Sequence, residues 1–234
     1  MISMTKDAHG KAVSYLLSKC HDLPILSIMT YGSYARGDYK LSSDIDLLVV
    51  IDSQRYNSKD LKSLIKICEI CKTKFDVIMQ PDIILDSEIR LWNRGILLDG
   101  HSFSDLSSYN KDGKVLFGED IRNRFRLPSD FQERAQVNLE IIEAEFKRWF
   151  CHSYHQTGKS LVPHWMTGWL LCTFLNTLGT VEITSFEETC EHIDKIPNIA
   201  GTSSFKKFKA KKELTADDFI VLHRTIKKST KAIT

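Results

Sequence analysis

Two aspartates separated by one residue stand at the start of an apolar run. The run is DIDLLVVI, residues 44–51, and its composition predicts a buried strand. Because side chains alternate along a strand, Asp44 and Asp46 point to the same face, with Cα atoms about 6.6 Å apart. Burying two like charges that close costs several kcal/mol unless an opposite charge compensates. Carboxylate oxygens suit Mg²⁺ or Mn²⁺, so the pair predicts a divalent metal site.

A third carboxylate, Asp76, lies within KFDVIM, residues 74–79, which we predict to be another strand that ends before Pro81. If this strand pairs beside 44–51, the three carboxylates converge at one edge of the sheet. Converging carboxylates raise one another's pKa unless cations neutralise them. We therefore expect Asp44, Asp46 and Asp76 to hold Mg²⁺ or Mn²⁺, with two ions as the expected number.

Gly32 and Ser33 lie upstream, where a predicted strand over residues 25–32 gives way to a polar loop. A glycine there lets the backbone approach a phosphate closely, and backbone N–H groups with the serine hydroxyl can bind its oxygens. Arg36 could add a bidentate contact. The structural alternative is a turn followed by a polar strand start. A phosphate cradle beside metal-binding carboxylates is what phosphoryl or nucleotidyl transfer requires.

These residues together resemble the signature of a known superfamily. The stretch YGSYARGDYKLSSDIDLLVV, residues 31–50, contains Gly-Ser, ten intervening residues and Asp-Ile-Asp. This pattern is similar to that of the DNA polymerase β-like nucleotidyltransferases, and closest to the minimal and the aminoglycoside nucleotidyltransferases. The segment VLFGEDI, residues 115–121, also resembles the layout of the aminoglycoside adenylyltransferases.

The resemblance implies a role for each matching residue. Asp44 and Asp46 would bind metal, and Asp76 would be a third ligand or the general base. The nucleotide-binding candidates are Gly32, Ser33, Arg36 and Ser43. Some aminoglycoside enzymes take the base from a glutamate instead, for which the candidates here are Glu140, Glu143 and Glu145.

The resemblance also implies a reaction. The chain would transfer a nucleoside monophosphate, with AMP from ATP expected, to an acceptor hydroxyl and release pyrophosphate. A small molecule such as an aminoglycoside is the expected acceptor. Two alternatives stay open: a toxin–antitoxin-type enzyme that modifies a protein or a tRNA, and a non-catalytic nucleotide-binding module. The lysine-rich run FKKFKAKK, residues 205–212, is the best support for an RNA acceptor.

Strands alternate with helices early in the chain, whereas only helices follow later, which predicts an α+β fold in two domains. We expect a nucleotidyltransferase domain over residues 1–120, with a small mixed sheet and helices, and a helical domain over residues 121–234. Helices are predicted at 6–21, 59–72, 82–94, 129–156, 161–178, 185–196 and 215–231, strands at 25–32, 44–51, 74–79 and 114–117, and a loop region at 100–113.

Composition is ordinary for a soluble globular protein, at 42% hydrophobic and 26% charged residues in 234. Residues 1–120 carry 15 Lys and Arg against 17 Asp and Glu, and residues 121–234 carry 17 against 13. The opening residues lack the apolar core of a signal peptide, so we expect a cytoplasmic protein with free thiols. On that basis the pair Cys68-x-x-Cys71, which lies on a helical stripe, is interpreted as core packing.

Overall fold

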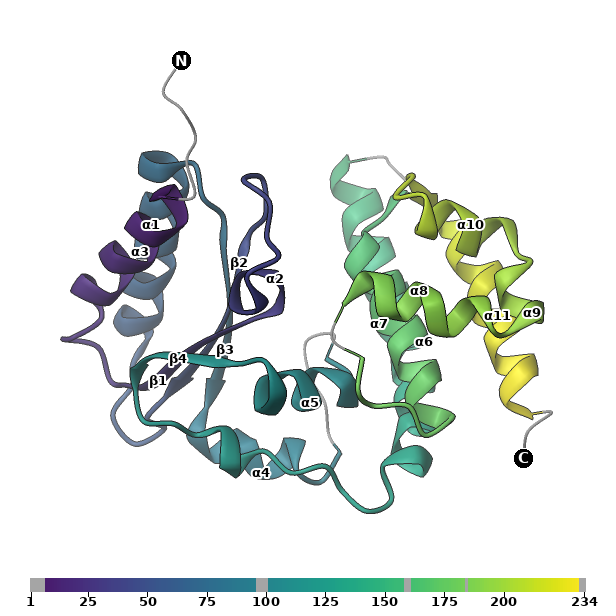
Figure 1. Ribbon diagram of the computed structural model, residues 1–234, viewed down its shortest axis with the longest axis horizontal. Coiled ribbons are helices and arrows are strands. Elements are labelled where there is room, and N and C mark those ends of the chain that lie inside the picture. The colour runs from purple at the N-terminus through teal and green to yellow at the C-terminus, as the bar shows by residue number, and fades with distance from the viewer. Residues whose placement is uncertain (1–6, 96–100, 158–160, 184, 232–234) are drawn as a thin grey trace. The chain divides into compact units, whose positions relative to one another are not determined.

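The computed structural model describes residues 7–95, 101–157, 161–183 and 185–231 (Figure 1). The chain forms two compact units, and both are discontinuous in sequence. Unit 1 comprises Met1–Asn93 and Ser108–Arg126, and unit 2 comprises Arg94–Ser107 and Leu127–Thr234. The sequence suggested one crossing after residue 120, whereas the chain crosses three times, and residues 101–107 pack with the helical unit.

Unit 1 is built on a four-stranded mixed sheet. Its strands are β1 Ile25–Tyr31, β2 Ile45–Ile51, β3 Met79–Leu85 and β4 Lys114–Gly118, in the order β3-β2-β1-β4. β1 is antiparallel to both β2 and β4, whereas β2 and β3 are parallel and joined through a helix. The predicted α+β class with a small mixed sheet is therefore confirmed.

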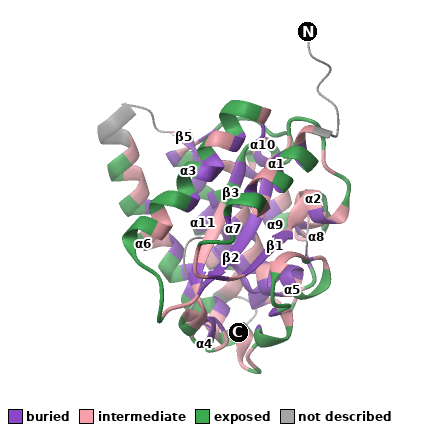
Figure 2. Cartoon of the chain, turned by 90° about the vertical axis from the view of Figure 1, so that its left-hand side faces the viewer, coloured by how far each residue is buried: buried purple, intermediate pink, exposed green. Residues whose placement is uncertain are grey.

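Two helices, α1 Asp7–Lys19 and α3 Ser58–Phe75, cover one face of this sheet. Their apolar stripes pack on the alternate residues of β2 that point the same way, such as Leu47 and Val49, both fully buried. Figure 2 shows the strands buried behind helices whose outer surfaces are exposed. Cys68 and Cys71 lie in this core, as predicted, and burial raises the pKa of both thiols, to about 12 and about 11.

Aromatic side chains cover the other face of the sheet. Tyr31 of β1 lies edge-on to Tyr109 of α5 Phe103–Lys111, with ring centroids 4.9 Å apart. Trp92, at the end of α4 Ile89–Trp92, and Phe125 complete the cluster with centroid distances of 5.6–6.1 Å. The rings pack against the strand end at which Tyr31 pairs with Asp46. Trp92, Tyr109 and Phe125 are all buried in this packing.

Unit 2 is helical, as predicted for the C-terminal part of the chain. Its helices are α6 Phe131–Thr157, α7 His164–Thr177, α8 Phe186–Asp194, α9 Pro197–Ala200, α10 Ser203–Lys209 and α11 Ala216–Lys231, with a short ribbon of β5 Leu161–Val162 and β6 Leu214–Thr215. The central helix α7 is buried on nearly all sides, which agrees with its continuous apolar sequence. No helix in the described part of the chain is both long and apolar enough to cross a membrane.

The predictions of a strand at 74–79 and a helix at 82–94 are wrong. Helix α3 continues to Phe75, β3 occupies Met79–Leu85, and only a 3₁₀ turn, Asp86–Glu88, and the short α4 follow. Pro81 was expected to end the strand but lies inside it. Since β3 is an edge strand, a residue without an N–H group can be accommodated there.

The prediction of a loop at 100–113 is also wrong, because α5 forms within this segment. Ser102 precedes the helix and its backbone N–H donates to the Asp105 carboxylate, as the N-cap N–H does in a capping box, while its hydroxyl donates to the same carboxylate at 2.9 Å. The buried Asn176 of α7 accepts a hydrogen bond from the Phe103 N–H at 3.0 Å. Tertiary contacts thus stabilise a helix in a segment whose serine-rich composition favours a loop. A second short helix, α2 Gly32–Arg36, begins the predicted loop 33–43.

Candidate active site

The Gly-Ser pair and the Asp-x-Asp pair meet at the end of the β1–β2 ladder. Tyr31, the last residue of β1, is paired with Asp46 of β2, so the chain leaves the sheet directly beside the Asp46 carboxylate. Gly32 has a left-handed φ of +66°, and a Cβ added there would collide with Asp46 Oδ2. Only glycine fits both the backbone conformation and the space. Folding thereby brings a motif of fifteen residues together at one corner of the sheet. Below, "the corner" means the site at Gly32, Ser33, Asp44 and Asp46.

Helix α2 presents its N-terminal backbone groups at this corner. Its N-cap, Tyr31, makes no side-chain capping bond. The first N–H groups of a helix have no acceptor within the helix, so this turn is a candidate site for binding phosphate oxygens. Ser33 is half-buried in the same turn. Arg36, at the other end of α2, pairs with the exposed Asp38 at 3.4 Å.

The turn before Asp44 is stabilised by hydrogen bonds within the turn and by a contact from α1. The Ser43 N–H donates to the Lys40 carbonyl at 3.0 Å, and the Ser43 hydroxyl oxygen accepts from the Lys40 N–H at 2.9 Å. His9 Nε2 of α1 lies 2.9 Å from the Ser43 carbonyl oxygen, within hydrogen-bond distance. The His9 ring is buried against Tyr34 and Tyr39, at centroid distances of 6.0 and 4.8 Å.

The three carboxylates expected from the sequence differ in their placement. Asp44 and Asp46 are half-buried at the start of β2. Asp76 instead caps the C-terminus of α3 with a left-handed φ of 55°, and its side chain is exposed. Its N–H group donates to the Lys72 carbonyl at 3.1 Å. Within the described ranges, no three His, Cys, Asp or Glu side chains are grouped as metal ligands.

Asp82, which the sequence analysis missed, lies on the same face of the sheet as Asp46. Gln80 pairs with Asp46 across the parallel ladder, and Asp82 is two residues further along β3. The Tyr31 hydroxyl donates to Asp82 Oδ2. Burial, Tyr109 and the Asp82 and Asp46 carboxylates raise the pKa of Tyr31 well above its usual value, so the hydroxyl keeps its proton. The segment QPDIIL, residues 80–85, could have indicated that the strand continues to Asp82 and beyond. Pro81 hid this, because proline is unusual inside a strand.

The three glutamates considered as a base all lie on α6, in different environments. Glu140 is exposed. Glu143 pairs with two lysines, which lower its pKa to about 2, so it is a weak base at neutral pH. Glu145 pairs with Arg148 one turn away on the same helix.

The Gly-Ser and Asp-x-Asp corner lies within the part of the chain that matches a family model. Residues 13–104 match the model described as "Nucleotidyltransferase domain". A protein of Methanocaldococcus jannaschii named "Putative protein adenylyltransferase" is 34% identical over 93 residues, which make up 40% of this chain and 79% of that protein. The chain belongs to the DNA polymerase β-like nucleotidyltransferase superfamily.

Two further proteins are similar to this chain. A second M. jannaschii protein of the same name is 36% identical over 56 residues, which cover 24% of this chain and little more than half, 56%, of that protein. The crystal structure of spectinomycin adenyltransferase AAD(9) from Enterococcus faecialis, with ATP and spectinomycin, matches with a TM-score of 0.57. That match covers 95% of this chain and 99% of the other at 12% identity, so it shows a shared fold.

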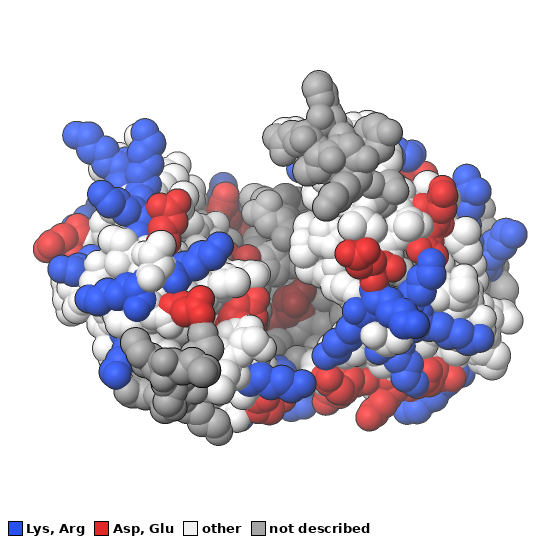
Figure 3. All heavy atoms as spheres, turned by 90° about the horizontal axis from the view of Figure 1, so that it is seen from above, with Lys and Arg blue, Asp and Glu red and all other residues white. Residues whose placement is uncertain are grey.

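The lysine-rich run FKKFKAKK, residues 205–212, forms most of α10 and the turn after it. Phe205 and Phe208 point into the core of unit 2. Lys207 pairs with Asp218 at 2.8 Å, Lys209 with Asp194 at 2.5 Å and Lys211 with Glu187 at 3.7 Å. On the side where α10 lies, basic and acidic side chains are interspersed (Figure 3). Local ion pairs account for much of this charge, so the run is weaker support for RNA than its sequence suggested.

Proposed function

We propose that the chain transfers AMP from ATP to a hydroxyl group of an acceptor and releases pyrophosphate. The observation that carries the proposal is the corner at which Gly32, with no room for a side chain, lies against the Asp46 carboxylate. Phosphate-binding backbone and metal-binding carboxylate are adjacent there, as nucleotidyl transfer requires. Family membership supports the same reaction class.

The residues at this corner have separable roles. The N–H groups of the first turn of α2 and the Ser33 hydroxyl bind the outer phosphates of ATP. Asp44 and Asp46 would hold Mg²⁺, for which carboxylate oxygens are suitable ligands. Bound Mg²⁺ would neutralise phosphate charge. The acceptor oxygen attacks the α-phosphorus, the bond to the bridging oxygen of the pyrophosphate breaks, and a carboxylate takes the hydroxyl proton.

That proton-accepting or third metal-binding carboxylate has two candidates. The resemblance assigns it to Asp76, which precedes β3, whereas the shared sheet face favours Asp82. Asp76→Asn and Asp82→Asn separate them by transfer rate at constant ATP affinity. We expect the larger loss in Asp82→Asn. If Asp76→Asn has the larger loss, the assignment from the resemblance holds and the one from the sheet face is wrong.

A small hydroxylated molecule, such as an aminoglycoside or aminocyclitol, is the acceptor that we propose. The support is the fold shared over 95% of the chain, helical unit included, with an enzyme whose crystal structure contains ATP and spectinomycin. A protein hydroxyl is the second candidate, favoured by the names of the two M. jannaschii relatives. The longer of those matches covers 93 residues, or 40% of this chain.

Mass spectrometry distinguishes these acceptors. The purified chain is incubated with Mg²⁺ and each nucleoside triphosphate in turn, together with an aminoglycoside and aminocyclitol panel, bulk tRNA or the protein alone. A gain of one AMP on a small molecule supports the first candidate, and a gain on protein supports the second. A gain on tRNA contradicts both acceptors while leaving the reaction class intact.

A second experiment distinguishes an enzyme from a module that binds nucleotide without catalysis. Mg²⁺-dependent ATP binding by calorimetry is measured beside the mass-spectrometric panel, with Asp46→Asn as the matched inactive control. Binding together with an adduct that disappears in Asp46→Asn supports the enzyme. Binding with no adduct on any acceptor favours the non-catalytic module, and absence of binding contradicts the proposal as a whole.

A further inference from the structure

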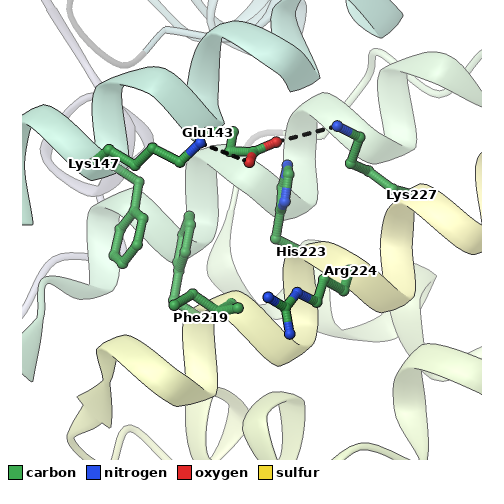
Figure 4. A pocket seen from close by; sticks show the side chains of 8 residues that line it. Glu143, Lys147, Phe219, His223, Arg224 and Lys227 are labelled. Carbon is green, nitrogen blue, oxygen red and sulfur yellow. Dashed lines mark hydrogen bonds and ion pairs between the residues drawn. The ribbon is translucent and has the colours of Figure 1, made fainter.

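A cavity of about 310 Å³ lies between α6 and α11, entirely within unit 2. Figure 4 shows side chains reaching it from both helices. Those from α6 are Glu143, Phe146 and Lys147, and those from α11 are Phe219, Ile220, His223, Arg224 and Lys227. Its volume is at the small end of the range of about 300–1,000 Å³ that is usual for ligand sites. The nucleotide-binding corner of unit 1 contributes none of these residues.

Stacked rings form one wall of this cavity. Phe146 of α6 lies on Phe219 of α11 with ring centroids 4.3 Å apart and planes 19° apart. Phe219 is nearly parallel to His223, at 6.3 Å and 4°. All three side chains are buried. Most of the surface of these rings is covered by their mutual packing, so a ligand reaches only the part that this packing leaves, together with the partly buried Ile220.

His223 contributes a neutral group to this wall. Its Nε2 lies 3.2 Å from the Leu139 carbonyl oxygen on α6 and, as the N–H, donates to it. Burial lowers the pKa of His223. Glu143 favours the charged imidazole, whereas Lys227 and Lys147 oppose it, and the net effect leaves the ring uncharged at neutral pH. The charge of the cavity is therefore set by its lysines, its arginine and its glutamate.

Positive charge exceeds negative charge around the opening. Glu143 is bonded on one side to Lys147 at 3.0 Å and on the other to Lys227 at 3.1 Å (Figure 4). One carboxylate cannot balance two ammonium groups. Arg224 adds a third positive charge and forms no hydrogen bond or ion pair within the described part of the chain. The ion pair between Glu143 of α6 and Lys227 of α11 joins the two helices, so these side chains have a structural role. Arg224 takes no part in that ion pair.

We propose that this cavity binds a small organic anion that carries an aromatic or other apolar body. The anionic group, a carboxylate, sulfonate or phosphate, pairs with the Arg224 guanidinium beside Lys147 and Lys227. The apolar body packs on Phe146, Phe219 and Ile220. A metal cation or a polyamine does not suit a site with this surplus of positive charge.

Fluorescence titration of the full chain tests this with two related probes. The first is 8-anilinonaphthalene-1-sulfonate, and the second is N-phenyl-1-naphthylamine, which has the same rings without the sulfonate. We expect saturable binding of the sulfonate at one site and at least fivefold weaker binding of the neutral probe. Equal affinities, or binding of the sulfonate without saturation, would overturn the proposal.

Matched variants on α11 localise the binding. Arg224→Gln should weaken sulfonate binding at least fivefold, whereas Lys228→Gln, an exposed lysine outside the cavity, should change it less than twofold. Ile220→Ser should weaken both probes, and Val221→Ser, at the exposed neighbouring position, should weaken neither. Circular dichroism checks that all four variants are folded. Equal effects within either matched pair would contradict binding in this cavity.

Discussion

The acidic corner of unit 1 and the cavity of unit 2 carry surplus charge of opposite sign. Asp44 and Asp46 lie at the start of β2 and Asp82 lies on the same face of the sheet as Asp46, whereas Arg224 and two lysines surround a single glutamate in the helical unit. Like charges brought together by folding cost free energy in the absence of a ligand. This difference in charge agrees with the two proposals, a cation with its nucleotide at the corner and an organic anion in the cavity.

The two regions are also assembled differently. The corner comes mostly from one contiguous stretch, since Gly32 and Asp46 are joined by a short loop and a two-stranded ladder. The cavity combines residues from α6 with residues more than seventy positions later on α11. Local geometry therefore defines the first region, and helix packing defines the second.

The largest expected effect comes from Asp46→Asn, which removes charge from the corner. We expect a loss of transfer of at least about 100-fold, because metal-based charge stabilisation contributes several kcal/mol. The melting temperature without Mg²⁺ checks that the variant is folded. Asp22→Asn, at an exposed position, serves as the control for both measurements. Transfer near the wild-type rate would contradict the role of the corner.

Gly32→Ala tests the space beside that carboxylate. Both Gly32 and Gly37 have a left-handed φ, of +66° and +88°, but only at Gly32 would a Cβ meet another side chain. Gly37→Ala should cost about 1 kcal/mol from backbone strain alone. Gly32→Ala should cost more in urea unfolding and should also weaken ATP binding. Equal losses of stability, with ATP binding intact, would show that the close approach to Asp46 does not matter.

The pH dependence of stability tests whether the His223 imidazole is held neutral in the cavity wall. Since its pKa is lowered on folding, the unfolded state takes up the proton first, so stability falls as pH drops below about 6.5. His223→Gln should lack this component, which is at most about 1.4 kcal/mol per pH unit. Urea unfolding of both proteins between pH 7.5 and 5.5 measures the difference. Parallel curves would mean that the imidazole is not held neutral.

The smallest effect is expected for Glu143→Gln, which removes the one negative charge of the cavity. Glu143 is partly exposed, so the stability loss at pH 7 should be below about 1 kcal/mol. Because the pKa of Glu143 is lowered to about 2, this loss should disappear as pH falls from about 4.5 towards 2. Binding of the naphthalene sulfonate should become tighter. Weaker binding of that probe would contradict the charge argument.

Much of the fold follows from local pattern. Helices α1 and α3 were predicted because their apolar residues recur at helical spacing, α6 because Ser129 is a plausible N-cap, and β1, β2 and β4 because short apolar runs lie beside turn signals. The Gly-Ser and Asp-x-Asp pairs could be recognised because the pattern lies within one short stretch of sequence. The family and the class of reaction follow from that one stretch.

Only the tertiary structure decided the features that depend on distant partners. The register of β3 against β2 places Asp82 on the face of Asp46, whereas the extra turn of α3 makes Asp76 an exposed cap. Asn176 stabilises α5 from a helix more than sixty residues away. The α6–α11 cavity has no sequence motif at all. Residue pattern determines the faces of each element, but long-range packing determines which faces meet.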